Sequence, residues 1–181
     1  EIRQSATGEI LIHDSLLQLA NVSSTATASS LHGNILGDET ARLLVNRGTH
    51  VFHVDSVINV NQAEFVNTSA TIEGSLEAPQ VSLAGSTVSV TGTIADPETL
   101  TLWNANLSLS PAGGPSVFSP GTLTVESATL STTGDLVLNG DSWYHNALLS
   151  GSSDSVIENN GEMAVHGDLT ISEFDLINQG T

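Results

Sequence analysis

The chain has 181 residues, of which 39% are hydrophobic, 4% aromatic and 13% charged. Its 20 acidic residues outnumber 3 arginines and give a net charge of −17, so no basic surface is available for nucleic acid or an anionic membrane. Without cysteine there can be no disulfide, thiol catalysis or cysteine–zinc site. Because no apolar run reaches the roughly 20 residues that a membrane helix needs, we expect no membrane insertion.

The amino-terminal part of the chain is the less regular one. Residues 15–20 and 39–45 could each form a short helix, although strands are favoured at both places. From residue 48 onward, apolar residues alternate with Ser and Thr in short runs bounded by Gly, Asn and Pro, which is typical of half-buried strands. We therefore divide the chain into less regular coils at 1–47 and one continuous repeat region at 48–181. The plainest runs are 81–83, 87–90, 100–102, 107–109, 123–125 and 136–138.

A repeated unit runs through this pattern: an aliphatic residue, one to a few polar residues, a glycine, then an alternating strand. Between the first and last of these glycines we count six coils of about 22 residues. A single coil of this size cannot bury its apolar face, so the coils must stack. The repeat predicts an all-β fold, a parallel β-helix of about eight coils that is roughly 40 Å long. The repeating glycines are Gly48, Gly74, Gly92, Gly134, Gly161 and Gly180.

These glycines are expected to share one corner with a left-handed backbone, which Gly and Asn tolerate. A change of Gly161 to Val should then cost more stability than the same change at Gly151, which lies outside the repeat. A β-sandwich is the alternative fold, since it also has short strands and frequent turns. It offers no reason for the recurring glycine.

Histidines are the candidates for metal binding and carboxylates the candidates for catalysis. For both we favour an interpretation without a functional site. His50 and His53 are three apart in a predicted strand, so they should point to opposite faces and not chelate a metal together. The acidic pairs Asp135 with Asp141 and Glu158 with Glu162 could serve glycoside hydrolysis. No lysine or arginine lies near them in the sequence, so we expect solvated turn residues. We expect no catalytic residue, no enzyme activity, no cofactor and no metal site, apart from weak nonspecific calcium binding.

Two kinds of residue could contact partners. Trp143 and Tyr144 interrupt the small-residue pattern and could stack on a glycan or a partner, although covering the core is the commoner role of such rings. Three glycosylation sequons begin at Asn21, Asn67 and Asn106, and they matter only in a secreted eukaryotic protein.

The segments 167–172 and 175–180 resemble the repeats of filamentous-haemagglutinin-type adhesins and autotransporter passenger domains. The resemblance covers roughly residues 70–181. It implies a right-handed parallel β-helix that is secreted or displayed on the cell surface and used for adhesion.

The function expected from these observations is structural: a stiff stalk or filament building block of a secreted or cell-surface β-solenoid protein. The carboxyl end shows no polar or helical cap, so we expect further coils or like subunits to stack end to end, with host or matrix glycans as other partners. A β-helical glycan-active enzyme or glycan-binding protein is one alternative. A glycosylated eukaryotic extracellular filament component is the other.

Overall fold

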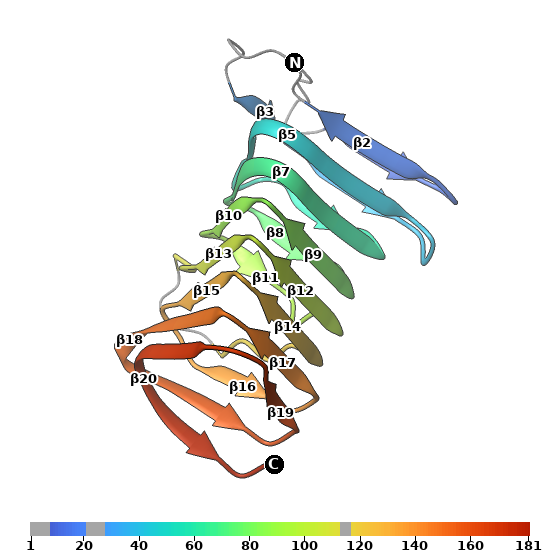
Figure 1. The fold of residues 1–181 in the computed structure, drawn as a ribbon. Helices are drawn as coiled ribbons and strands as arrows, with labels where there is room; N and C mark the ends of the chain where they lie inside the picture. Colours follow the sequence, from blue (N-terminus) through green and yellow to red (C-terminus); the bar gives the residue numbers. More distant parts are fainter. Residues whose placement is uncertain (1–7, 21–27, 113–116) are drawn as a thin grey trace.

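The computed structural model describes residues 8–20, 28–112 and 117–181, and these form 20 β-strands and no helix. Every pairing between the described strands is parallel, which rules out the antiparallel β-sandwich alternative. The strands stack coil upon coil into a β-solenoid of about seven turns, one fewer than expected (Figure 1). Both stretches that could have been helical, 15–20 and 39–45, contribute to strands.

Three faces run along the solenoid, and each coil contributes a strand to most of them. The first face contains β1 (Glu9–Ile12), β4 (Asn34–Gly37), β6 (Val57–Asn59), β8 (Ser75–Glu77), β11 (Thr93–Ile94), β16 (Leu136–Leu138) and the second halves of β18 (Ala147–Asn159) and β20 (Leu169–Asn178). The first face is interrupted between β11 and β16, where one isolated bridge joins Phe118 to Leu136.

The second and third faces belong to one continuous sheet. The second face contains β2 (Leu16–Ala20), the first halves of β5 (Arg42–Phe52) and β7 (Gln62–Ile72), then β9 (Gln80–Ala84), β12 (Thr99–Trp103), β14 (Thr122–Glu126), β17 (Ser142–His145) and β19 (Met163–Val165). The third face contains β3 (Ser29–Leu31), the second halves of β5 and β7, β10 (Thr87–Val90), β13 (Asn106–Leu109), β15 (Thr129–Thr132) and the first halves of β18 and β20.

The strand register shows that the coils differ in length. Gln62 pairs with Gln80, which closes a short coil. Near the amino-terminal end, Leu16 pairs with Arg42, which closes a distinctly longer one. The predicted coil length lies between these two spacings, and the coils around β1 to β5 are among the longest.

The core is built from columns of stacked aliphatic residues. Alternate residues of each strand point inward, and parallel pairing places them directly over their counterparts in the next coil. One such column consists of the buried residues Leu43, Ala63, Val81, Leu100 and Leu123. Burying a leucine side chain contributes roughly 1.5–3 kcal/mol, so successive coils are held together by hydrophobic contacts and by backbone hydrogen bonds.

The recurring glycines do not share one corner, and their role differs from the predicted one. Gly74 and Gly92 stack between the third and first faces, whereas Gly161 and Gly180 stack between the first and second faces. None of these four has a positive φ, which the structure instead gives to Gly33, Gly48, Gly85 and Gly167. Glycine is needed in both columns for space: a Cβ on Gly161 would lie 2.2 Å from the carbonyl oxygen of Gly140, and one on Gly180 would lie 2.0 Å from that of Gly161.

A left-handed corner does exist, but between the second and third faces. There one residue of most coils, and two in β5, have a positive φ, and Gly and Asn predominate, as the physical argument requires. The prediction is therefore right about the backbone conformation and wrong about the corner. The residues of this corner are Arg47, Gly48, Asn67, Gly85, Asn104, Ser127, Asn146 and Gly167, so Gly48 is the one recurring glycine that has the predicted conformation.

We predict that a change of Gly161 to Ala lowers the free energy of unfolding by about 1–3 kcal/mol, because the added methyl group would force apart two packed coils. Urea denaturation followed by circular dichroism measures this loss. Ser82→Ala, on an outward position of β9, is the control and should change stability by less than about 0.5 kcal/mol. Gly151→Ala should also be destabilising, since its Cβ would lie 2.6 Å from the carbonyl oxygen of Glu173. Equal stability of the Gly161 variant and the wild type would contradict the packing argument.

Candidate functional site

A partly exposed group of aromatic side chains lies on the second face toward the carboxyl-terminal end of the stack. Trp143 occupies an outward position of β17, between Thr124 of β14 and Ala164 of β19. Two imidazole rings border the indole: the ring centroid of His145 lies 5.8 Å away, edge to face, and that of His166 lies 5.7 Å away with a tilt of 34°. Because the side chain of Ala164 is small, the protein surface is low beside the indole of Trp143 at the paired position of the next coil.

A second outward column flanks this tryptophan. Parallel pairing aligns Trp103 with Glu126 and Glu126 with His145, and the Nδ1 atom of His145 lies 3.9 Å from Oε1 of Glu126. Trp103 is 52% exposed. We call Trp103, Glu126, Trp143, His145 and His166 the aromatic patch. Its two indoles belong to coils two apart, or roughly 10 Å along the stack. Flat exposed rings beside a carboxylate offer a ligand both stacking surfaces and a hydrogen-bond acceptor.

Tyr144, the other aromatic residue expected to contact a glycan or partner, points into the solenoid. Its side chain is fully buried, in the same inward column as Leu102 and Val125. Burial raises the pKa of its hydroxyl to about 12. The physical reason is the period of two along a strand, which sends neighbouring residues to opposite faces. Tyr144 therefore belongs to the core, which is the commoner role of such rings, and it is not available for stacking on a ligand.

The members of the two candidate carboxylate pairs occupy different places in the coil. Asp135 and Asp141 stand at opposite ends of β16, and Oδ1 of Asp135 accepts a hydrogen bond from the backbone N–H of Val156. Glu158 lies on the first face, where its Oε1 accepts a hydrogen bond from Nε2 of Gln179, whereas Glu162 follows the Gly161 corner. In both pairs one member is thus engaged in a hydrogen bond between coils.

The side chains of His50 and His53 point in different directions, as predicted. His50 points inward and is 1% exposed, whereas His53 is partly exposed just beyond the end of β5, so the two do not face each other. Among the residues that the structure describes, no three His, Asp or Glu side chains are grouped closely enough to hold a metal ion.

Two of the three sequon asparagines lie on the surface. Asn67 is exposed at the left-handed corner, and Asn106 is exposed at the start of β13. Asn21 lies outside the described residues. Both described positions are open to a modifying enzyme. The hydroxyl of the first sequon belongs to Ser69, which is exposed, whereas the intervening Thr68 donates its Oγ1 proton to the carbonyl of Gly48.

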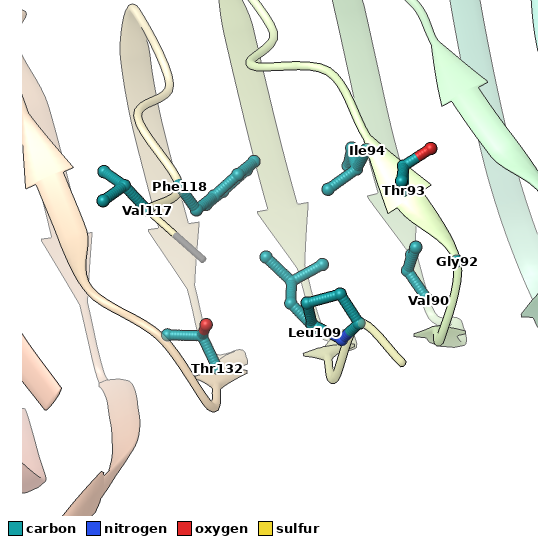
Figure 2. Close-up of a pocket in the computed structure, with 9 residues that line it drawn as sticks. Val90, Gly92, Thr93, Ile94, Leu109, Val117, Phe118 and Thr132 are labelled. Atoms are coloured by element: carbon teal, nitrogen blue, oxygen red, sulfur yellow. The ribbon is translucent and has the colours of Figure 1, made fainter. Parts of the chain in front are cut away.

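A cavity of about 150 Å³ lies where the first face is interrupted (Figure 2). Its lining is mostly apolar, with Ile94 and Phe118 on one side and Val90 and Leu109 on the other, and it contains no titratable side chain among the described residues. Its lining also includes Pro111 and Val117. This cavity offers no acid, base or nucleophile for a reaction.

Sequence reasoning singled out Trp143 but did not place His145, His166 and Glu126 beside it. No signal in a single sequence aligns residues of different coils unless the register is already known. Within the described ranges, no helix is long and apolar enough to cross a membrane. Comparison of the chain with protein-family models, with curated proteins and with solved structures finds no match.

Burial of the His50 imidazole leads to a testable prediction about how the stability of the protein depends on pH. Its Nε2 lies 2.8 Å from the carbonyl oxygen of Arg47, and burial lowers its pKa below the ordinary value of 6.5. Below pH 6.5 the unfolded chain therefore binds a proton at this imidazole more readily than the folded protein does. The free energy of unfolding consequently decreases as the pH is lowered. We expect this histidine to contribute a loss of up to about 1.4 kcal/mol per pH unit.

Urea unfolding at pH 7.5 and 5.5 measures this contribution as the difference between the wild type and His50→Gln. The loss of stability on acidification should be smaller in the variant. His13→Gln, at a largely exposed position, is the control and should leave the pH dependence as it is in the wild type. The same acid-induced loss in wild type and His50→Gln would show that His50 does not contribute.

Proposed function

We propose that this chain is a segment of a secreted or cell-surface β-solenoid protein, where it acts as a stiff stalk or filament building block. The observation that carries this proposal is the continuous parallel pairing from β2 to β19 and from β3 to β20 along the stack. Backbone hydrogen bonds between coils then run parallel to the long axis. A rod of this kind resists bending and separates what is attached at its two ends.

End-to-end stacking of like coils is part of this proposal. In the last coil, Val165 stacks on the buried Tyr144 and Leu176 on the buried Ile157, so both point inward. They are nevertheless 45% and 49% exposed, because no further coil lies on them. An uncovered apolar layer beside an unpaired strand edge is a surface onto which another coil can add by parallel pairing. We propose that the partner at this end is a coil of the same kind.

The aromatic patch supports an adhesive role beside the structural one. Exposed indoles are suited to stacking on the apolar faces of sugars, and Glu126 can accept hydrogen bonds from hydroxyl groups. With a net charge of −17, the chain would repel acidic glycans, so the proposed ligands are neutral glycans of a host or matrix. A role as a filamentous-haemagglutinin-like or autotransporter-like adhesin is the finer form of this proposal, supported by the solenoid fold and the repeat style.

The two alternatives differ in their support. A glycan-cleaving enzyme has little support, because one member of each carboxylate pair is held in a hydrogen bond between coils and the described lining of the cavity has no titratable side chain. A glycosylated eukaryotic extracellular filament component is supported by the exposure of Asn67 and Asn106. Removal of N-linked sugars from the native material, followed by mass measurement, distinguishes that alternative from an unmodified rod.

End-to-end association is tested by sedimentation of the wild type, Leu176→Glu and Ile177→Glu. Ile177 is a matched control, since it is 46% exposed on the same strand but pairs with the outward residue Glu158. We expect the wild type and Ile177→Glu to associate, and Leu176→Glu to associate at least about tenfold more weakly, because a buried unpaired carboxylate is costly. A monomeric wild type at high concentration would contradict end-to-end stacking.

Glycan binding by the aromatic patch is tested by intrinsic fluorescence titration with neutral hexose oligosaccharides. Trp143→Ala should weaken binding about three- to tenfold, the effect of losing a stacking surface. Thr101→Ala, which lies two coils earlier in the same outward column, is the control and should bind like the wild type. Equal affinity of the Trp143 variant and the control would remove the patch from the proposed function.

A further inference from the structure

A hydrogen-bonded chain of serine, histidine and glutamate lies at the corner between the third and first faces, far along the stack from the aromatic patch. Nε2 of His53 lies 2.6 Å from Oγ of Ser30, and Nδ1 of the same ring lies 3.2 Å from Oε2 of Glu73. The three residues come from successive coils: Ser30 lies in β3, His53 follows β5 and Glu73 follows β7. Parallel pairing of these strands is what brings together residues that are 23 and 20 positions apart.

Neighbouring groups hold the imidazole of His53 in place. The ring of His32 stacks on it with a centroid distance of 3.9 Å and an interplanar angle of 13°. His32 is in turn oriented by Asp55, whose Oδ1 lies 3.1 Å from its Nδ1. The backbone N–H of His53 donates to the carbonyl of Leu31, and its own carbonyl accepts from the backbone N–H and the hydroxyl of Ser56. Stacking on the ring face, hydrogen bonds at the ring edge and hydrogen bonds of the residue's backbone thus fix the orientation of the imidazole.

This connectivity is the one that activates a serine nucleophile. A neutral imidazole that donates its Nδ1 proton to a carboxylate has a free lone pair on Nε2, and that lone pair can accept the proton of a hydroxyl group. The carboxylate selects this tautomer and stabilises the imidazolium that forms when the hydroxyl attacks. Ser30, His53 and Glu73 meet both distance requirements for such a unit.

We propose that Ser30 is a nucleophile toward carboxylic esters, with His53 as its general base and Glu73 as a positioning residue. Oγ of Ser30 attacks the ester carbonyl carbon and passes its proton to Nε2 of His53. The carbon–oxygen bond to the alcohol then breaks, and the alcohol leaves with that proton, which leaves an acyl group on Ser30. Attack by water through the same histidine releases the acid and restores the serine. This activity goes beyond the proposed stalk function.

The surroundings define the substrate class. His53 and Glu73 are 30% and 40% exposed, so the unit lies on an open corner and can be reached by an ester on an extended chain or a small molecule. The carboxylates of Glu73 and Asp55 and the net charge of −17 disfavour an anionic substrate. The substrates are therefore neutral carboxylic esters.

The solenoid supplies its own control serines. Register relates Ser30 to Val51, Thr71, Ser89 and Ser108 in one outward column of the third face. Ser89 and Ser108 therefore share the strand geometry of Ser30, but the next coil offers them Ser110 and Thr133 at the position where it offers Ser30 a histidine. A reagent that responds only to exposed hydroxyl groups will not distinguish the three serines.

The experiment uses a neutral alkyl fluorophosphonate, which a nucleophilic serine displaces to form an oxygen–phosphorus bond with loss of fluoride and a proton. Peptide mapping by mass spectrometry measures the labelling rates of Ser30, Ser89 and Ser108 in the same folded protein. We expect an adduct on Ser30 at a rate at least about 100-fold above that of the other two, which is the usual contribution of a general base. Similar rates at the three serines would overturn the proposal without any variant being needed.

Two substitutions then assign the roles. His53→Gln should lower the labelling rate of Ser30 and the hydrolysis of p-nitrophenyl acetate about 100-fold. Glu73→Gln should lower both by at least about tenfold while leaving the thermal unfolding midpoint unchanged, because a glutamine no longer selects the reactive tautomer. Labelling of Ser30 that persists in His53→Gln would overturn the assignment of the base. A Glu73 variant that loses stability but keeps its labelling rate would overturn the positioning role.

Discussion

Backbone hydrogen bonding between successive coils is the constraint on which the rest of this structure depends. A coil of this length leaves the N–H and C=O groups of its strands directed up and down the stack, and only a neighbouring coil in parallel register satisfies them. The same register places each inward residue over its counterpart and produces columns such as Leu43, Ala63 and Val81. Core and ladder therefore form together, and neither exists in an isolated coil.

Close approach of the coils explains the corner glycines better than backbone conformation does. Where the chain turns from the first face to the second, the carbonyl of one corner points at the α-carbon of the next, and Gly140, Gly161 and Gly180 leave room for it. At the left-handed corner the requirement is a different one, namely a positive φ. Asn67, Asn104 and Asn146 meet that requirement there. The two corners thus select their residues by different requirements, which are space between the coils at one corner and a positive φ at the other.

Register also brings surface chemistry together on the rod. Residues that are distant in the sequence become neighbours in outward columns, as in Trp103, Glu126 and His145 on the second face. The chain of Ser30, His53 and Glu73 arises in the same way at another corner. A solenoid can therefore acquire a binding surface or a reactive group by a single substitution per coil. With a net charge of −17, such rods repel one another in solution.

The sequence by itself determined the all-β character, the parallel solenoid and the opposite directions of His50 and His53. These follow from local properties: period-two alternation, turn residues and a repeated unit. The tertiary structure decided which corner each glycine occupies, because coil lengths that vary along the stack hide the register from any counting of intervals. It also decided that Tyr144 is core while Trp143 is surface, since two adjacent aromatic residues do not reveal which one faces inward. The pairing of His53 with Ser30 and Glu73 depends on three coils at once, and physical contact across coils exists only after they have stacked.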